Sequence, residues 1–331
     1  MNIFIYSLMP EPTITQKQHI PQVDYIRAIA SLAVAVFHLG GKKIPIAGSV
    51  TGYGWAGVEM FFFLSGFIIC WSIPENYDLS VARKFITKRL IRIEPPYIAS
   101  MAIALIVNIY WFDHYKFSWT DILLHLAYLN NFFGHTYLSS VYWTLGIEFQ
   151  FYLFIAITFP FIIKKWGAWA VVALCIPTAF LGDHFGLLPG VLTFFTLGIL
   201  YYLYRKGIKK LPEVLILGVI VTALAIYEQT LAHALGSLFA LLLLILPLKS
   251  NSVVSFFSKI SFSLYLTHEI IGLKVETFIY LYCSLPYGMM SKGIAFAGAF
   301  IFSIAFAYLF YRFIEAPCFR LSKKIKYPSK A

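Results

Sequence analysis

Charged residues are scarce in this chain. Only 12% of its 331 residues are Asp, Glu, Lys or Arg, and 60% are hydrophobic, whereas a soluble domain carries about 25% charged residues. Apolar runs recur from residue 23 to residue 314, which leaves no room for a large soluble domain. The composition therefore predicts an integral membrane protein.

Three further absences narrow the class. The four cysteines, Cys70, Cys175, Cys283 and Cys318, show no CxxC or other metal-ligand spacing, which argues against both a disulfide framework and a zinc site. The first nine residues lack a basic region and are too short for a signal peptide. The sequence shows no fixed-period repeat and no similarity between its halves, which disfavours a secondary transporter.

What the chain has instead is a series of apolar segments near 20 residues long, the length that crosses the hydrocarbon core. They predict an all-α, polytopic membrane protein with about ten transmembrane helices. The fifth segment is short, and polar residues interrupt the ninth. The expected spans are residues 23–40, 53–73, 96–113, 142–163, 167–182, 187–204, 213–228, 231–248, 258–282 and 294–314. Residues 121–140 are too polar to cross and are expected to form a re-entrant or surface loop.

Basic residues fix the expected orientation, because cytoplasmic loops are enriched in Lys and Arg. With both termini in the cytoplasm, 21 of the 26 basic residues fall on that side. The expected non-cytoplasmic side holds Lys42, Lys43, Lys116 and Lys292, and Lys274 lies within the ninth span. The net charge of +11 is therefore a topology signal and implies no nucleic acid. The expected organisation is a cytoplasmic segment 1–22, a transmembrane domain 23–314 and a basic cytoplasmic tail 315–331.

The first span contains the stretch RAIASLAVAVFH, which begins and ends with ionisable side chains that are costly to place in lipid. His38 lies eleven positions after Arg27, which is about 16 Å of rise and about three turns, so both side chains share one helix face. Asp24, three residues before Arg27, could pair with it. One interpretation without a functional role is that Arg27 anchors the topology and His38 is a hydrogen-bonded core histidine. Ionisable residues inside a membrane span are, however, functional by default.

Other spans also carry ionisable groups. Glu59 lies near the outer end of the second span, and Glu148 lies in the fourth, where Tyr142 and Trp143 could line a cavity. His268 and Glu269 lie about 14 Å past Lys259 in the ninth span, a depth compatible with that of His38. Two histidines and up to three carboxylates are therefore expected to converge on one polar cavity.

A pair of arginines precedes the third span. Arg89 and Arg92 are three residues apart and would project from one helix face. Such a pair suits a phosphate-bearing ligand, although the positive-inside rule alone accounts for many clusters of this kind. Pro95 and Pro96 are expected to break the helix just before the span.

Six stretches together resemble the acyltransferase-3 family of integral membrane acyltransferases. They are DYIRAIASLAVAVFH, GVEMFFFLSGFII, KRLIRIEPPY, WTLGIEFQFYL, SFSLYLTHE and FYRFIEAP, which occur in the family's order over residues 24–317. The resemblance implies a ten-helix bundle in the bacterial cytoplasmic (inner) membrane. It also implies transfer of an acyl group, commonly acetyl from acetyl-CoA, to a hydroxyl of a glycan or lipid-linked sugar such as lipopolysaccharide or exopolysaccharide.

The resemblance also implies roles for individual residues. Arg27 and His38 match the family's essential pair, Arg89 and Arg92 its paired arginines, and Glu148 its carboxylate. His38 and Glu148 are then catalytic, while the three arginines bind acyl-CoA. The donor is a substrate, and no permanently bound cofactor or metal is expected.

Several alternatives stay open from the sequence. His38 could act as a general base or as a nucleophile, and either Glu148 or Glu269 could orient it. A transporter or flippase for a lipid-linked or small anionic molecule would use the same polar groups as a pathway. A structural partner in a polysaccharide assembly complex is a third possibility.

Overall fold

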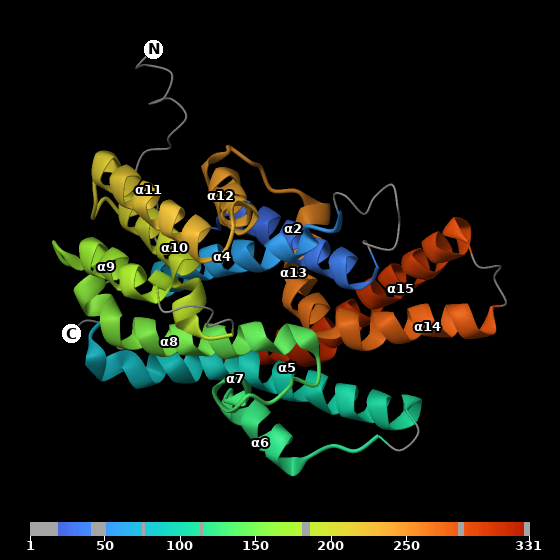
Figure 1. The fold of residues 1–331 in the computed structure, drawn as a ribbon. Coiled ribbons are helices and arrows are strands. Elements are labelled where there is room, and N and C mark those ends of the chain that lie inside the picture. The colour runs from blue at the N-terminus through green and yellow to red at the C-terminus, as the bar shows by residue number, and fades with distance from the viewer. Residues whose placement is uncertain are drawn as a thin grey trace.

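The computed structural model describes residues 19–40, 51–74, 77–112, 115–180, 186–283 and 288–327, and these residues form helices and no strand (Figure 1). Most of the predicted segment 1–22, the end of the tail, and Lys17, Lys42, Lys43 and Lys330 lie outside the described residues. The α-helices are α2 (Pro21–His38), α4 (Gly57–Ser72), α5 (Ala82–Trp111), α6 (Trp119–Ala127), α7 (Asn130–Phe133), α8 (Trp143–Ile162), α9 (Gly167–Phe180), α10 (Leu192–Arg205), α11 (Leu211–Glu228), α12 (Leu231–Ile245), α13 (Ser252–Thr267), α14 (Leu273–Tyr282), α15 (Met289–Phe310) and α16 (Ala316–Lys324).

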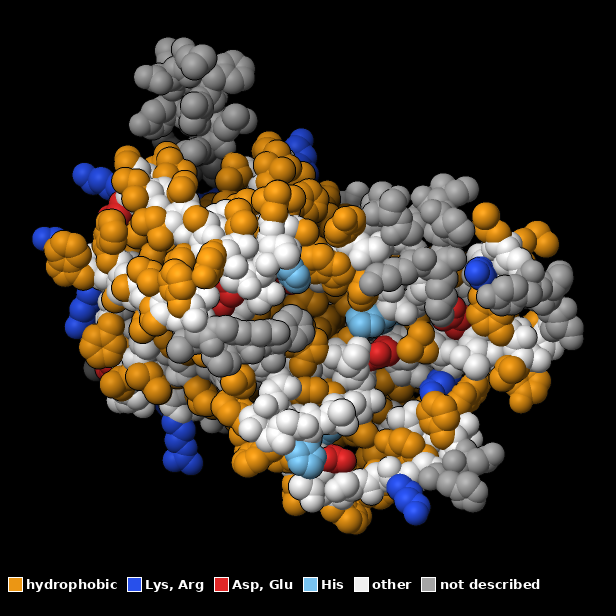
Figure 2. Space-filling view, in the orientation of Figure 1, with side chains coloured by type: hydrophobic (Ala, Val, Ile, Leu, Met, Phe, Trp, Pro, Cys, Tyr) orange, Lys and Arg blue, Asp and Glu red, His pale blue; other side chains and the backbone are white. Residues whose placement is uncertain are grey.

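Each of the ten predicted spans overlaps a helix. Within the described residues, five helical segments are long and apolar enough to cross a membrane, and α9 and α12 are shorter apolar helices. The five segments are Gly54–Ser72, Leu79–Trp111, Ser140–Ile162, Leu211–Glu228 and Met289–Lys324. Hydrophobic side chains cover much of the face drawn in Figure 2, as expected for helices that face lipid. The all-helical membrane fold is therefore confirmed, and the count of ten spans stays a prediction.

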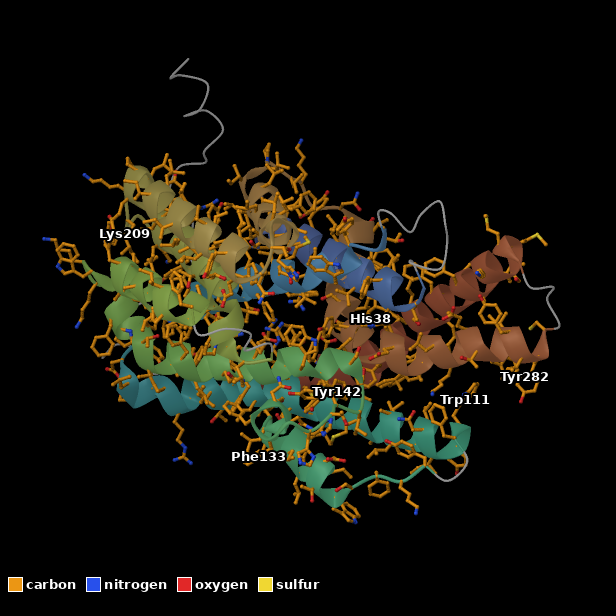
Figure 3. All side chains as sticks on the ribbon, in the orientation of Figure 1. His38, Trp111, Phe133, Tyr142, Lys209 and Tyr282 are labelled. Carbon is orange, nitrogen blue, oxygen red and sulfur yellow. The ribbon has the colours of Figure 1, made fainter. Side chains whose placement is uncertain are left out.

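The basic loops gather at one end of the bundle. Lys209 Nζ donates to the backbone oxygen of Lys165 at 2.5 Å, which joins the α8–α9 and α10–α11 loops. Lys88 Nζ, near the start of α5, donates to the backbone oxygen of Ile325 beyond α16 at 3.4 Å. Most of the Lys and Arg side chains visible in Figure 2 lie toward the end where Figure 3 labels Lys209. We predict that this end faces the cytoplasm, following the enrichment of basic residues there.

Close packing of α4 against α10 forms the centre of the hydrophobic core. A Cβ at Gly66 would collide with the backbone oxygen of Phe195, and a Cβ at Gly198 would collide with that of Phe63. Small residues at such positions let two helices approach closely within a membrane. Phe62 and Phe195 pack against each other in this α4–α10 interface, which we call the α4–α10 seam, with ring centroids 4.9 Å apart.

The two prolines do not end the helix, contrary to the prediction. α5 runs unbroken from Ala82 to Trp111, with Pro95 and Pro96 inside it. Proline removes a backbone hydrogen bond, but α5 packs against α8, α13 and α16. This tertiary packing outweighs the free-energy cost of the two prolines. Arg89 and Arg92 therefore lie on the same helix as the third predicted span.

The polar interruption of the ninth span is a π-helical segment. Residues His268–Gly272 form one π turn between α13 and α14, so the chain continues as a helix from Ser252 to Tyr282. A second π turn, Tyr311–Glu315, joins α15 to α16. Single π turns inside α-helices often mark functional sites, and these two carry His268, Glu269 and Glu315.

Residues 119–142 form a hairpin that returns along α5. The Tyr128 hydroxyl donates to Glu94 Oε2 at 2.7 Å, and the rings of Tyr128 and Tyr97 stack at 5.3 Å. Glu94 lies 17 residues before Trp111, about 25 Å back along the helix. Figure 3 shows Phe133 well back from Trp111 along the long axis of the molecule. We call residues 119–142 the re-entrant hairpin because the chain turns back along α5; both predicted alternatives, a re-entrant and a surface loop, stay predictions.

Candidate active site

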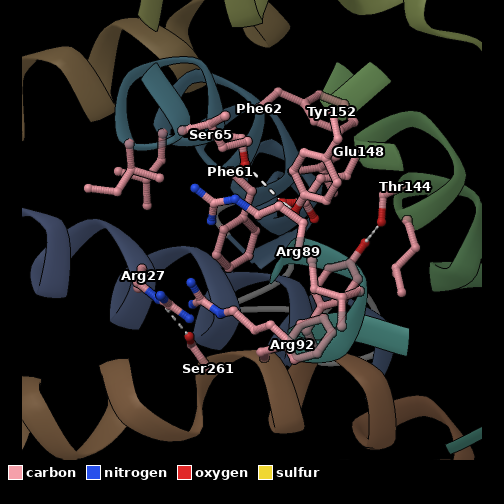
Figure 4. A pocket seen from close by; sticks show the side chains of 18 residues that line it. Arg27, Phe61, Phe62, Ser65, Arg89, Arg92, Thr144, Glu148, Tyr152 and Ser261 are labelled. Carbon is pink, nitrogen blue, oxygen red and sulfur yellow. Dashed lines mark hydrogen bonds between the residues drawn. The ribbon is translucent and has the colours of Figure 1, made fainter. Parts of the chain in front are cut away.

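A pocket opens between α2, α4, α5, α8 and α13, with an empty volume of about 930 Å³ that is partly open to solvent (Figure 4). Arg27 enters it from α2, and Arg89 and Arg92 enter from α5. Glu148 is the one carboxylate among the lining residues. The charge of the lining is therefore positive, as an anionic ligand requires.

Short hydrogen bonds hold the polar groups of the pocket. Arg27 Nε donates to Ser261 Oγ at 3.1 Å, and the Arg89 guanidinium donates to the Ser72 hydroxyl. The hydroxyl of Tyr152 donates to Glu148 Oε1 at 2.5 Å. Arg92 lies over the ring of Phe319 in α16, 5.1 Å from its centroid. The arginines are thereby placed with nitrogens left to bind a ligand, because each guanidinium carries five N–H donors.

The rest of the pocket wall is apolar. It offers a hydrophobic path from the arginines toward the interior of the bundle, suited to a ligand with a charged head and a long, less polar arm. The apolar lining residues are Val58, Phe61, Phe62, Leu64, Ile68, Ile69, Ile93, Leu145 and Phe262.

A second polar group, which we call the histidine centre, consists of His38, His268 and Glu269. The rings of His38 and His268 lie 5.3 Å apart between centroids, and His38 Nδ1 lies 4.0 Å from Glu269 Oε1. His268 is fully buried; its Nδ1 lies 2.8 Å from the backbone oxygen of Leu264. Nδ1 therefore donates, which leaves Nε2 as the acceptor nitrogen. The predicted match in depth between His38 and His268 is confirmed.

Glu269 is held in place by the re-entrant hairpin. The Ser139 hydroxyl donates to Glu269 Oε2 at 2.5 Å, and the backbone N–H of Ser140 donates to the same oxygen at 2.7 Å. The other oxygen faces His38. At 4.0 Å from Nδ1, this carboxylate can stabilise the protonated imidazole of His38 by charge attraction.

Tyr265 connects the pocket to the histidine centre. It lines the pocket, and its hydroxyl shares a hydrogen bond of 2.7 Å with Thr144 Oγ1, another lining residue. Its ring centroid lies 6.2 Å from that of His268. His38 does not line the pocket itself. The single cavity expected from the sequence is therefore two neighbouring sites with Tyr265 between them.

Glu148 and Glu59 lie apart from His38. Glu148 belongs to the arginine pocket, so Glu269 is the carboxylate that neighbours the imidazole of His38. Glu59 is buried against α12, where its Oε1 lies 2.6 Å from His233 Nδ1. Of the up to three carboxylates expected to converge, Glu269 lies near His38 and Glu148 lines the neighbouring pocket, while Glu59 turns toward α12 and joins neither group.

The other predicted residues also have different neighbours from those expected. Asp24 accepts a hydrogen bond of 2.6 Å from Ser258 Oγ, while Arg27 pairs with Ser261. Tyr142 donates to Ser100 Oγ at 3.0 Å in the core. Trp143 packs at 6.1 Å from the ring of Phe62, and neither Tyr142 nor Trp143 lines the pocket.

Sequence reasoning missed several residues that shape the site. Ser258 and Ser261 are three residues apart on α13 and bind Asp24 and Arg27, which are three apart on α2, so the matched spacing was a usable signal. Glu315, in the FYRFIEAP stretch, accepts from Ser263 Oγ at 2.6 Å and interacts electrostatically with Arg27. No spacing in the sequence indicated the placement of Tyr265.

Apolar spans, a polar site inside the bundle and the order of the six motifs together define an integral membrane protein of the acyltransferase class. Residues 20–312 match the family described as "Acyltransferase domain". The chain belongs to this acyltransferase-3 family.

The chain is similar to several named proteins. ORF330 of Acidianus two-tailed virus is 35% identical over 43% of this chain and 42% of its own length. Nodulation protein 10 of Rhizobium leguminosarum bv. viciae is 31% identical over 51% of this chain and 54% of its own length. Peptidoglycan O-acetyltransferase OatA of Listeria monocytogenes is 26% identical over 48% of this chain and 27% of its own length. This chain thus spans about half or less of these relatives, and no solved structure matches it.

Proposed function

We propose that this protein is a membrane O-acyltransferase that transfers acetyl from acetyl-CoA to a hydroxyl of a bacterial cell-surface glycan or lipid-linked sugar. One observation carries the proposal. An arginine-lined pocket adjoins a histidine–carboxylate centre through Tyr265, and both are served by helix α2, in which Arg27 and His38 are about 16 Å apart.

The pocket would bind the donor. Arg27, Arg89 and Arg92 would neutralise the phosphates of CoA, because guanidinium groups bind phosphate oxygens in a bidentate manner. The apolar wall would take the pantetheine arm and direct the thioester toward Tyr265. Glu148, bonded to Tyr152, would set the position of the arginines by electrostatic attraction.

The histidine centre would carry out the transfer. His38 would take the proton from the acceptor hydroxyl while that oxygen attacks the thioester carbonyl. The carbon–sulfur bond then breaks, CoA leaves as the thiolate, and His38 returns the proton to it. Glu269 would stabilise the imidazolium that forms between these two proton transfers.

A covalent route uses the same residues. His38 would attack the thioester carbonyl, release CoA and then pass the acetyl group to the acceptor hydroxyl. Rapid mixing with labelled acetyl-CoA and no acceptor distinguishes the routes, because only the covalent route leaves label on the protein.

The names of relatives support the acceptor class. OatA is named a peptidoglycan O-acetyltransferase, which favours a surface glycan here and a multi-pass location in the bacterial cytoplasmic membrane. A transporter or flippase would need the same polar groups but would release no CoA.

The test is the ester-linked acetyl content of surface glycan in a deletion strain of the host, complemented with the wild type or with His38→Ala. Proton NMR before and after mild alkali reports these esters. We expect acetyl to vanish in the deletion, return with the wild type and stay absent with a His38→Ala protein present in the membrane at the wild-type level. Unchanged acetylation throughout, with no CoA release by the purified protein, would overturn the proposal.

A further inference from the structure

The re-entrant hairpin of residues 119–142 contains a buried histidine that the proposed chemistry does not use. His125 in α6 has no exposed surface, although α6 presents Trp119 and Leu123 outward. Both of its ring nitrogens are engaged. Nδ1 lies 2.6 Å from the backbone oxygen of Asp121, and the backbone N–H of Leu138 donates to Nε2 at 3.0 Å.

These two bonds fix the state of the ring. Nε2 accepts a proton donor, so Nδ1 must carry the hydrogen that it donates to Asp121. His125 is therefore held as one neutral tautomer that joins the first turn of α6 to the returning segment of the hairpin. Asn130 adds a second hydrogen bond to this segment, because its Nδ2 donates to the backbone oxygen of Thr136 at 3.2 Å.

The bond from Leu138 leads directly to the histidine centre. The next two residues, Ser139 and Ser140, supply both donors to Glu269 Oε2. Beyond them, the backbone oxygen of Val141 accepts from the Tyr265 hydroxyl at 3.3 Å. One short irregular segment therefore touches the catalytic carboxylate and the tyrosine that separates the two sites, and His125 holds its beginning.

We infer that His125 is a positioning residue: through the N–H of Leu138 it fixes the Ser139–Ser140 donor pair, which holds Glu269 beside His38. This inference rests on the proposed function. Irregular backbone at membrane depth is stable only where protein satisfies its polar groups, and His125 supplies that acceptor.

Loss of the acceptor has a defined consequence. In His125→Leu the Leu138 N–H, which lies in a part-buried place, loses its acceptor, so the segment shifts to satisfy it. A shift of about 1 Å at a catalytic group can cost about 10²-fold in rate. The arginine pocket is built by other elements, so kcat for acetyl transfer falls about 10- to 100-fold while KM for acetyl-CoA stays the same.

The experiment compares matched variants of the full-length protein in lipid nanodiscs, measuring CoA release with acceptor glycan present. His125→Gln keeps a side-chain oxygen that can accept from Leu138 and should restore most of the kcat lost in His125→Leu. His135→Leu is the control, because His135 lies in the same hairpin and bonds Asp121 Oδ1 at 2.6 Å but does not touch Leu138.

A double-mutant cycle with Glu269→Gln decides whether His125 acts through that carboxylate. If it does, His125→Leu adds little to the loss of kcat already caused by Glu269→Gln. Multiplied losses, an increased KM for acetyl-CoA, or equal losses in His125→Leu and His135→Leu would overturn the inference.

A second double-mutant cycle, of His125→Leu with Ser139→Ala, is read out by the melting temperature and keeps the two proposals separate. Coupling between these two substitutions in thermal unfolding is expected whether or not the protein transfers acetyl. If the wild type releases no CoA, the proposed function fails; if it does and both cycles are additive, only the role of His125 fails. If His125→Leu does not fold, His125→Gln and Ser139→Ala complete the same comparison.

Discussion

The arginine pocket and the histidine centre are built in different ways. The pocket takes its charged groups from the regular helices α2, α5 and α8, and it is open enough to admit a ligand. The histidine centre takes Glu269 from a π turn and its supporting donors from the re-entrant hairpin. Within the described residues, regular helices therefore supply the arginines and His38, whereas the π turn supplies His268 and Glu269 and the hairpin supplies the donors that hold Glu269.

This difference has a physical basis. A ligand with several phosphates tolerates small shifts of long, flexible arginines. A proton transfer needs its groups within hydrogen-bond reach and correctly aligned. Glu269 lies in a π turn, and the hairpin bonds its carboxylate at two points. Mutations should therefore separate the two sites by their kinetic signatures.

The largest expected effect is at His38. Loss of the base in His38→Ala should lower kcat by about 10²- to 10⁴-fold and leave the binding of acetyl-CoA unchanged. Steady-state CoA release and the Kd for a non-hydrolysable acetyl-CoA analogue test this. A variant that keeps the wild-type kcat would remove His38 from the mechanism.

The two carboxylates should behave differently. Glu269→Gln keeps the shape but loses the charge beside His38, so kcat should fall about 10- to 10²-fold with KM unchanged. Glu148→Gln lies in the arginine pocket and should mainly change KM for acetyl-CoA. Measuring kcat and KM for acetyl-CoA on both purified variants tests this. A lower kcat in Glu148→Gln together with a changed KM in Glu269→Gln would assign the catalytic role to Glu148.

The paired arginines should give the opposite signature to His38. A hydrogen bond to a charged group contributes about 1.5–3 kcal/mol, so Arg89→Ala or Arg92→Ala should weaken CoA binding about 10- to 100-fold. Lysine at either position should recover part of the loss, because it keeps the charge but not the bidentate geometry. Calorimetric titration with CoA measures this; an unchanged Kd with reduced kcat would contradict the division between the sites.

The smallest expected effect on activity is in the core that supports both sites. Gly66→Ala forces a Cβ against the backbone of α10 and should destabilise the fold by about 1–3 kcal/mol, seen as a lower melting temperature. Gly218→Ala is the matched control, since nothing lies within 4 Å of the added Cβ; it should be neutral or stabilising by up to about 1 kcal/mol. Equal destabilisation by both variants would contradict the tight α4–α10 seam.

Sequence reasoning located the helices well but located side-chain partners poorly. The run of apolar segments predicted helices where they occur, since a lipid-facing helix needs a long apolar stretch whatever its neighbours are. The local rule that proline ends a helix fails at Pro95 and Pro96, because tertiary packing holds α5. Glu59 was misplaced because its true partner, His233, is 174 residues away.

The sequence by itself determined that this is a helical membrane protein, that Arg27 and His38 share a helix face, and that its motifs are those of the acyltransferase-3 family. These properties follow from composition and from the fixed geometry of one helix. Only the tertiary structure decided that Glu269 is the carboxylate beside His38, that Tyr265 stands between the two sites, and that a re-entrant hairpin holds Glu269. Glu269 lies 231 positions from His38 and 130 positions from Ser139, and the directions of these contacts depend on a π turn and helix packing that no local pattern encodes.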